Sequence, residues 1–480
     1  MGTEQHGLCH SSDPQGFGNL RGLGDILLVA CYESGHPPLS LAWPLAFLKE
    51  AGYPAAALDA AVEAFPDEAA VRTTFVGISV PMPTALRLGA QVAARVRAVN
   101  PGAHICFFGL YAWLNADYLL SSLADSVVAG EDEAALVELI RVLVAGGDPG
   151  QVAGISTAQS RNEPRLARFA FPLPDRSALP SPEHYARYVH NGQSSLAGYV
   201  QASRGCRHTC RHCPIVPVYA GRFFVVPAET VLSDIRQQAR GGARHITFGD
   251  PDFLKGPRHA LQIARRLHAE FADLTFDFTT KVEHILEHRQ LFAEFAALGC
   301  TFVVSAIESL SDRVLERLAK GHTAVAIDEA LSILDAAGIA LHPTLVAFTP
   351  WTTLDDYLAQ LAWIRARGLA NHVPPIQLAI RLLVPPRSAL LASPDVDGWL
   401  GALDPEAFTY RWAHPDSRMD TLYQQAAARV EWAEQTGEAR AQTHEAIRAL
   451  AYAAAGRPIP THPAPPARPL PPRLTEDWFC

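Results

Sequence analysis

Short apolar runs alternate with amphipathic stretches over most of this chain, and this alternation limits its possible folds more than any other feature. In the first part the predicted strands are apolar and bounded by polar residues: DILLVAC (25–31), FVGISV (75–80), HICFF (104–108) and SVVAG (126–130). The stretches between them have helical periodicity. The pattern predicts a leader at 1–24, expected to be disordered, and then a doubly wound, Rossmann-like α/β domain at 25–148.

A second series of strands and helices follows a connector. Residues 149–196 lose periodicity and gather Pro, Ser and Asn, which is typical of a linker. Six strand candidates then follow, in the order GYVQAS, HITFGD, TFDFTT, FVVSAIE, LHPTLVAF and IQLAIRLLV. Six βα units predict a partial (βα)6 barrel of the TIM type at 197–390. We expect a helical C-terminal region at 391–456 and a Pro-rich tail at 457–480.

Polar side chains stand where the predicted barrel strands end. In parallel barrels the reactive residues gather at the C-terminal ends of the strands, so these side chains are expected to face one mouth. They are Asp250 and Asp252 after the second strand, Lys281 after the third, Glu308 and Ser309 at the fourth, and Arg381 within the sixth.

The stretch RGCRHTCRHCP (204–214) places Cys206, Cys210 and Cys213 directly after the first barrel strand. A disulfide framework belongs to small secreted chains, so metal binding is the better interpretation. Three thiolates without a fourth would hold a cubane iron–sulfur cluster and leave one iron open for chemistry. A structural zinc site, with His208 or His212 as fourth donor, is the alternative.

Three arginines, Arg204, Arg207 and Arg211, surround these thiols. Their positive charge would raise the potential of a cluster or guide an acidic flavodoxin to it, and a solvated loop is the plain alternative.

The composition excludes several classes of protein. A net charge of −9 disfavours a general nucleic-acid binder, which needs clustered Lys and Arg. The first residues lack an apolar stretch of signal-peptide length, and no later run approaches a membrane span. The chain has eight cysteines, and the five outside the central trio are scattered, which suits a reducing compartment. We therefore expect a cytoplasmic protein with no membrane partner.

The cysteine spacing, the preceding glycine, the loop VYAGRFF and the six βα units together resemble the radical S-adenosylmethionine (SAM) superfamily. The resemblance implies a [4Fe–4S] cluster on the cysteine trio, SAM bound at the open iron, its reductive cleavage to a 5′-deoxyadenosyl radical, and a flavodoxin or ferredoxin as reductant. It also assigns SAM contacts to the strand ends. These are Phe248, Gly249, Asp250 and Asp252 in ITFGDPDF, then Lys281, then Glu308 and Ser309 in SAIES, and Arg381 in RLLVPPRSALL, where Arg387 replaces the usual glycine.

The first domain resembles the cobalamin-binding domain found in one branch of that superfamily. The resemblance rests on LLVACYESGHPPLSLAWPLAFLKEAG, the GIS motif and AGEDEAAL, and it implies cofactor contacts at Ser79, Gly109, Gly130 and Glu131. No Asp-x-His-x-x-Gly motif is present, so a lower histidine ligand to cobalt is not expected. The bulky Phe108, Leu110 and Trp113 in FFGLYAWL leave two interpretations: a cobalamin pocket lined by aromatics, or a domain that only packs.

The tRNA methylthiotransferases resemble this order of domains but carry three more cysteines in the first domain and a basic module at the end. Here the first domain has Cys31 and Cys106, with Cys9 in the leader, and the ending is Pro-rich. RNA modification is therefore disfavoured.

The tail ends in Trp478, Phe479 and Cys480, an unusual finish for a solvated linker. We expect a docked end that presents Cys480 to a pocket as a catalytic thiol, with a frayed terminus as the alternative. The whole chain resembles radical SAM proteins named for a Cys-Cys-Ala-Glu-Pro or Cys-selenocysteine-Ala-Glu-Pro tail, and it stops at the first cysteine of that tail. This suggests the hypothesis that the next codon is a UGA read as selenocysteine.

These observations predict a radical SAM enzyme that transfers a methyl or other group to a small molecule or peptide. The alternative is a non-catalytic metal or metalloid carrier that uses the cysteine trio and Cys480.

Overall fold

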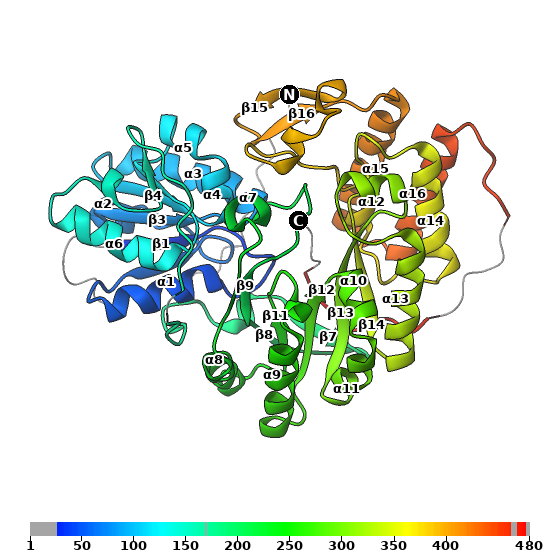
Figure 1. The fold of residues 1–480 in the computed structure, drawn as a ribbon, viewed down its shortest axis with the longest axis horizontal. Helices are drawn as coiled ribbons and strands as arrows, with labels where there is room; N and C mark the ends of the chain where they lie inside the picture. Colours follow the sequence, from blue (N-terminus) through cyan, green and yellow to red (C-terminus); the bar gives the residue numbers. More distant parts are fainter. Residues whose placement is uncertain (1–25, 169, 462–467, 477–480) are drawn as a thin grey trace.

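The computed structural model describes residues 26–168, 170–461 and 468–476, so the leader and Cys480 lie outside the described residues. The first domain, at the left of Figure 1, is a six-stranded sheet in the order β2-β1-β3-β4-β5-β6. Neighbouring strands are parallel except β6, which is antiparallel to β5. The strands are β1 (Ile26–Ala30), β2 (Ala56–Asp59), β3 (Phe75–Ser79), β4 (His104–Phe108), β5 (Ser126–Val128) and β6 (Ile155–Thr157).

Helices cover this sheet, as the sequence pattern predicts. They are α1 (Leu39–Glu50), α2 (Asp67–Arg72), α3 (Pro83–Val99), α4 (Leu110–Leu114), α5 (Ala116–Ser122) and α6 (Asp132–Val144). Two strands, β2 and β6, were not predicted. The sequence of β2, AALD, lacks the branched residues that mark a strand, and β6 lies in the expected linker, where three residues are too few to show a period.

The second sheet is curled and has seven strands in the order β14-β13-β12-β11-β8-β7-β17. The five strands from β14 to β8 are parallel, whereas β7 and β17 are antiparallel to their neighbours. The strands are β7 (Arg187–His190), β8 (Gln193–Val200), β11 (His245–Phe248), β12 (Thr275–Thr280), β13 (Cys300–Glu308), β14 (Ala340–Leu345) and β17 (Arg473–Leu474). The predicted α/β class with a partial barrel is confirmed, and β7 is a further strand within the expected linker.

The barrel helices lie on the outside of this sheet (Figure 1). They are α8 (Ala228–Arg240), α9 (Pro257–Glu270), α10 (Val282–Glu287), α11 (Phe292–Ala297), α12 (Asp312–Arg317), α13 (Ala324–Ala337) and α14 (Leu354–Ala366). The core between the two layers is rich in phenylalanine, with Phe248, Phe276, Phe278 and Phe295 all fully buried.

The prediction of a sixth barrel strand is wrong. The first residues of IQLAIRLLV belong to a 3₁₀ turn at Pro375–Leu378, and an isolated β-bridge joins Arg381 to Phe348. Pro374 and Pro375 directly precede this stretch, and the turn begins at Pro375, where the fixed φ of proline suits a first helical turn.

The C-terminal tail lies at the open side of the barrel instead. β17 pairs with β7 at one edge of the sheet. At the other edge, Nε2 of His342 on β14 lies 2.9 Å from the carbonyl oxygen of Pro472. Residues 472–474 therefore contact both edge strands.

The region expected to be helical begins with a hairpin, β15 (Leu400–Asp404) and β16 (Thr409–Trp412), at the top of Figure 1. Two long helices follow, α15 (Ser417–Thr436) and α16 (Arg440–Ala454), and α16 packs on α14. Among the described residues, no helix has the length and apolar character needed to span a membrane.

His444 on α16 makes the stability of this region depend on pH. Its buried ring contacts the Val373 carbonyl oxygen at 2.8 Å, and burial lowers its pKa to about 4. Unfolded histidine ionises near pH ~6.5, so the unfolded chain gains the proton first as the pH falls, and the stability present above that pH is lost toward pH 4. We expect the stability advantage of the wild type over a His444→Gln variant to shrink by about 2 kcal/mol between neutral pH and pH ~5. Urea unfolding of both proteins at both pH values measures this stability advantage. An advantage that is the same at both pH values would contradict the prediction.

Candidate active site

The cysteine loop begins at the end of a short antiparallel pair, β9 (Ser203–Gly205) with β10 (Phe223–Val225). Gly205 has φ of 71°, and a Cβ there would lie 2.4 Å from the Arg222 carbonyl oxygen, so this tight start requires glycine. The helix α7 (Ile215–Tyr219) follows the last cysteine. Cys206, Cys210 and Cys213 are all free thiols and line one cavity.

This cavity, of about 340 Å³, lies between the two domains. Its volume is at the lower end of the range of ligand pockets. From the first domain it is lined by residues that follow β1, β3 and β4, among them His36, Met82 and Tyr111. The other walls are the cysteine loop, the ends of β11, β12, β13 and β14, and the tail residues Arg473, Leu474 and Glu476.

Five predicted SAM-site residues line this cavity: Phe248, Gly249, Asp250, Lys281 and Glu308. At Gly249 a Cβ would lie 2.1 Å from the ring and hydroxyl of Tyr199, so a side chain there would displace the tyrosine. Sequence analysis did not identify Tyr199 as a wall, because its partner stands 50 positions later in the chain.

Asp250 holds the chain that leads into the cysteine loop. Its carboxylate accepts a hydrogen bond from the backbone N–H of Ala202 at 2.9 Å and another from the Ser203 hydroxyl. Burial raises the pKa of Asp250 to about 7. This carboxylate is thus already engaged in fixing β9.

Glu308, at the end of β13, is paired with a lysine that sequence analysis missed. Its carboxylate lies 3.1 Å from Nζ of Lys320 and 3.4 Å from Nε2 of His212. Burial alone would raise the pKa of Glu308, but the Lys320 ammonium and His212 lower it to about 2. Glu308 also has φ of 67°, a strained conformation for a residue with a side chain and one that often marks functional sites. The sequence holds no motif that singles out Lys320.

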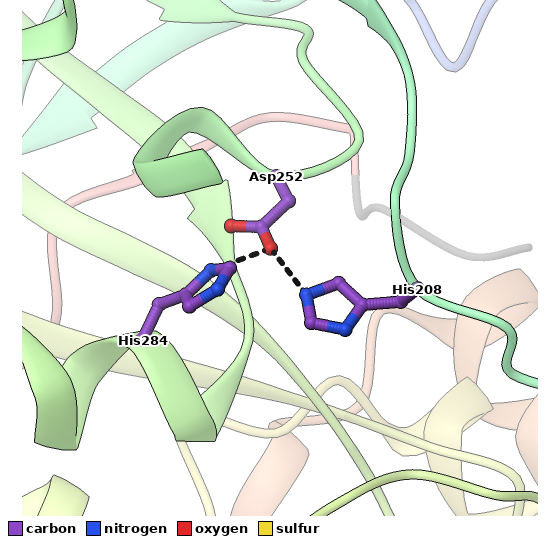
Figure 2. Close-up of side chains that lie close together, drawn as sticks. All are labelled: His208, Asp252 and His284. Atoms are coloured by element: carbon purple, nitrogen blue, oxygen red, sulfur yellow. Dashed lines mark ion pairs between the residues drawn. The ribbon is translucent and has the colours of Figure 1, made fainter. Parts of the chain in front are cut away.

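Asp252 does not line the cavity, and its carboxylate faces His284 and His208 (Figure 2). Its Oδ2 lies 2.7 Å from Nδ1 of His284 and 3.4 Å from Nε2 of His208. Burial alone would raise the pKa of Asp252, but the two histidines hold it well below its usual range. Both loop histidines, His208 and His212, therefore face carboxylates in this structure, which disfavours either as a fourth zinc ligand.

Two predicted SAM contacts lie away from the cavity. Ser309 is buried, and its hydroxyl oxygen accepts the backbone N–H of Ser311. Arg381 donates to Asp420 and to the Trp412 carbonyl oxygen, each at 2.7 Å, and its guanidinium stacks on the Trp412 ring. Because the sixth strand is replaced by a 3₁₀ turn, Arg381 points into the C-terminal region.

The four predicted cobalamin contacts do not line the cavity either. The Ser79 hydroxyl donates to Ser40 inside the first domain, at 2.7 Å. Gly109 and Gly130 have positive φ, and a Cβ on Gly130 would lie 2.2 Å from the Arg165 carbonyl oxygen, so this glycine serves a close approach of two chain segments. Of the bulky residues near them, Leu110 lines the cavity, whereas Phe108 and Trp113 are buried in the domain core.

Glu131, the fourth of these, forms an ion pair across the two domains. Arg204 on β9 reaches Glu131 at 2.9 Å and Glu133 at 2.5 Å, and all three side chains are buried. Of the three loop arginines, Arg204 is thus engaged internally, Arg211 is half-buried, and Arg207 is exposed. The ion pair couples the start of α6 to the strand that enters the cysteine loop.

Comparison with known sequences finds a family model that matches the part of the chain that carries the cysteine loop. Residues 200–360 match the model of the Radical SAM superfamily. An uncharacterised methyltransferase of Pyrococcus horikoshii is 26% identical over 248 residues, covering 50% of this chain and 51% of that protein. A hopanoid C-3 methylase of Methylococcus capsulatus is 23% identical over 231 residues, covering 48% of this chain and 44% of that protein. The chain spans about half the length of these curated relatives.

A methylthiotransferase also resembles the chain. The tRNA-2-methylthio-N(6)-dimethylallyladenosine synthase of Desulfosudis oleivorans is 27% identical over 256 residues, covering 44% of this chain and 53% of that protein. In the described part of the first domain here, the cysteines are Cys31 and Cys106, and both are buried.

Two solved structures share the fold over most of the chain. The cobalamin-dependent SAM radical enzyme OxsB with aqua-cobalamin superposes with a TM-score of 0.69 at 15% identity, covering 90% of this chain and 73% of that chain. The radical SAM methyltransferase TsrM of Kitasatospora setae, with cobalamin and a [4Fe–4S] cluster, has a TM-score of 0.57 at 17% identity, covering 71% and 70%. Both likenesses extend beyond the barrel.

The residues on the loop fit the cofactors of this family, which are a [4Fe–4S] cluster and SAM. Three free thiols stand on one loop at the mouth of the barrel, and the cavity beside them is bounded by the strand ends predicted to hold SAM. The chain therefore carries a radical SAM domain over residues 200–360, within an α/β fold shared with solved cobalamin-dependent radical SAM enzymes.

Proposed function

We propose that this protein is a radical SAM enzyme that transfers a methyl group to a small molecule or peptide, with cobalamin as second cofactor. The observation that carries the proposal is that the cysteine loop, the barrel strand ends and the first domain line the same cavity. When bound by Cys206, Cys210 and Cys213, a reduced cluster supplies the electron that cleaves SAM to methionine and a 5′-deoxyadenosyl radical.

The chain's own residues would orient SAM and exclude water. Phe248 and Gly249 offer backbone at the wall nearest the loop. Lys320 and Glu308 form a buried pair beside the cysteines and place one positive and one negative charge at the mouth. Amino and carboxylate groups of a ligand have complementary charges to this pair.

Cobalamin would lie on the first domain's side of the cavity. The wall there is apolar and aromatic, with Met82, Leu110 and Tyr111. The names of the hopanoid methylase and of TsrM support methyl transfer, and the titles of the OxsB and TsrM structures support cobalamin as the cofactor. A methylthio transfer is disfavoured because Cys31 and Cys106, the described cysteines of the first domain, are buried at different strands.

We further propose that the tail delivers the Cys480 thiol to this cavity. Cys480 lies outside the described residues, but the chain up to Glu476 enters the cavity wall. Thr475 anchors it, because its N–H donates to the Arg187 carbonyl oxygen at 2.8 Å and its hydroxyl accepts the Arg187 N–H at 2.9 Å. Glu476 accepts the hydroxyl hydrogen bond of Tyr32 in the first domain.

Undocking the tail is expected to expose the cavity thiols. A Thr475→Pro change removes both bonds to Arg187, which at about 1 kcal/mol each corresponds to roughly thirtyfold more open tail. In apo-protein with Cys480→Ser, labelling of Cys206 and Cys213 by a bulky maleimide should accelerate by that factor. The buried Cys106 and Cys300 are internal controls. Equal labelling rates in both proteins, mapped by mass spectrometry, would show that the tail is not a wall.

The proposed function is tested by anaerobic reconstitution with iron and sulfide, reduction and addition of SAM. We expect 5′-deoxyadenosine, and with cobalamin a change in the amount formed or the appearance of a methylated product. Colourless protein with stoichiometric zinc would support the carrier hypothesis instead. A fully loaded, reducible cluster that leaves SAM intact with and without cobalamin would contradict the proposal.

A further inference from the structure

We infer that Asp252 is a positioning residue for the iron–sulfur cluster, because it fixes the loop between Cys206 and Cys210 through the side chain of His208. The inference rests on the proposed function and adds a role to a residue that does not line the cavity. Asp252 follows β11, whereas His208 stands midway between the two cysteines. Their ion pair thus connects the loop to the barrel (Figure 2).

Asp252 is itself held rigidly. It is 2% exposed, and its Oδ1 accepts a hydrogen bond from the Thr280 hydroxyl at 2.8 Å. Its other oxygen, Oδ2, lies between His284 and His208. Asp252 follows β11, whereas Thr280 at the end of β12 and His284 on α10 belong to the next βα unit. The anchor for the loop is therefore built on two neighbouring βα units.

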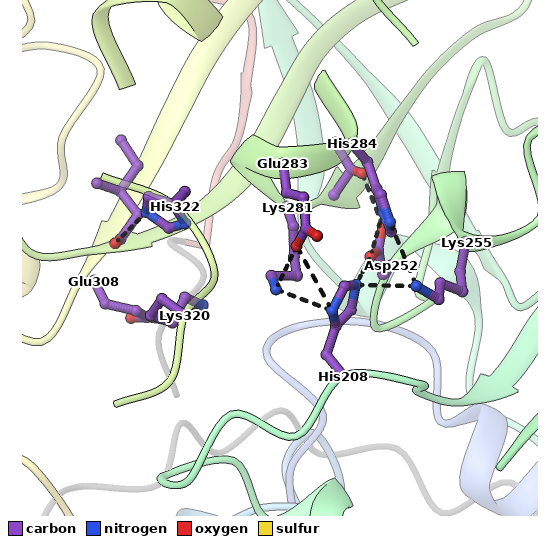
Figure 3. A network of polar contacts seen from close by, with 11 residues as sticks. His208, Asp252, Lys255, Lys281, Glu283, His284, Glu308, Lys320 and His322 are labelled. Atoms are coloured by element: carbon purple, nitrogen blue, oxygen red, sulfur yellow. Dashed lines mark hydrogen bonds and ion pairs between the residues drawn. The ribbon is translucent and has the colours of Figure 1, made fainter. Parts of the chain in front are cut away.

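The same three residues have the spacing of a metal site, since one ligand atom from each lies within 4.8 Å of the others. Two ammonium groups oppose this interpretation. Nζ of Lys255 lies 3.3 Å from Nε2 of His208 and 3.5 Å from Nε2 of His284, and Nζ of Lys281 lies 3.0 Å from Nδ1 of His208 (Figure 3). Positive charges at this distance repel a cation. The geometry favours an anchor made of carboxylate–imidazole contacts over a metal site.

The anchor also places charge beside the loop. Lys281 is buried, contacts His208 and pairs with Glu283 at 3.0 Å, while Lys255 contacts His208 from the other side (Figure 3). A cluster held by three thiolates carries negative charge, and nearby ammonium groups stabilise its reduced form and raise its potential. Loss of the anchor should therefore loosen the loop, and loss of Lys281 should lower the potential without loosening the loop as much.

The first test uses apo-protein, so that it does not depend on the cluster. Amide hydrogen exchange of residues 205–213 is compared in the wild type, Asp252→Asn and His208→Gln. Asp234→Asn is the matched control, because Asp234 is equally buried and paired with Arg176 away from the loop. We expect faster exchange in this loop for the first two variants and wild-type exchange for the control. Unchanged loop exchange in Asp252→Asn would overturn the inference.

The second test uses reconstituted protein. Iron loss to a chelator should be about tenfold faster in Asp252→Asn and in His208→Gln, and the double variant should be no worse than either, since both remove one interaction. Lys281→Met should shift the reduction potential to a more negative value. Additive effects of Asp252→Asn and His208→Gln on the rate of iron loss would overturn the inference. A wild type that binds no iron would instead contradict the proposed function, while the exchange test would still decide the role of Asp252.

Discussion

Replacing Cys206, Cys210 and Cys213 together with alanine is expected to abolish both the iron–sulfur absorbance and the formation of 5′-deoxyadenosine. The three thiols share one cavity, and the two histidines between them are paired with carboxylates, so the loop offers no substitute ligands. Iron and sulfide content, the visible spectrum and the product of SAM cleavage measure the effect. The loss should exceed a thousandfold, because the radical chemistry has no source without the cluster.

A Cys300→Ala variant is the matched control. Cys300 is also a free, buried thiol, but it begins β13 at the opposite end of the strand from Glu308. It should retain full iron content and SAM cleavage. A triple variant that keeps its cluster would show that other residues bind the metal.

Replacing Arg204 with methionine is expected to destabilise the protein by about 3–5 kcal/mol. Arg204 is the cation that pairs with the buried Glu131 and Glu133, and it also lies over the rings of Trp43 and Phe171. Its removal leaves two carboxylates buried without a counter-charge. Urea unfolding followed by circular dichroism measures the loss, which should be smaller at acidic pH, where the carboxylates bind protons.

Restoring charge balance should recover much of that stability. A variant with Arg204→Met, Glu131→Gln and Glu133→Gln removes the buried charges together, and replacing a whole buried ion pair is often nearly neutral. Arg411→Met is the surface control, because Arg411 pairs with Asp404 while its side chain is 76% exposed. That change should cost less than about 1 kcal/mol. A loss in Arg204→Met as small as in this control would show that the ion pair does not couple the two domains.

The predictions that held depend on residues close together in the chain. The strand runs DILLVAC, FVGISV and HICFF and the helices between them are formed because their apolar periodicity is local. The cysteine loop was recognised for the same reason, since its three thiols lie within eight positions. The strand that failed, IQLAIRLLV, had the right apolar pattern, but its first residues belong to a 3₁₀ turn that begins at the preceding Pro375.

The contacts of the site residues could not be predicted, because their partners lie far along the chain. Glu131, which the sequence analysis predicts as a cobalamin contact, pairs in the structure with Arg204, 73 positions away. Asp252 was expected to contact SAM, but its partners His208 and His284 come from other βα units. Tail residue Glu476 reaches Tyr32 across 444 positions.

The sequence by itself thus determined the α/β class, the partial barrel and the cysteine loop, because each depends on hydrogen bonding and periodicity within short segments. Only the tertiary structure decided which charged groups face the cavity and which neutralise one another. A buried charge is stable only beside a counter-charge. That partner can come from a distant part of the chain, so no local sequence pattern indicates it.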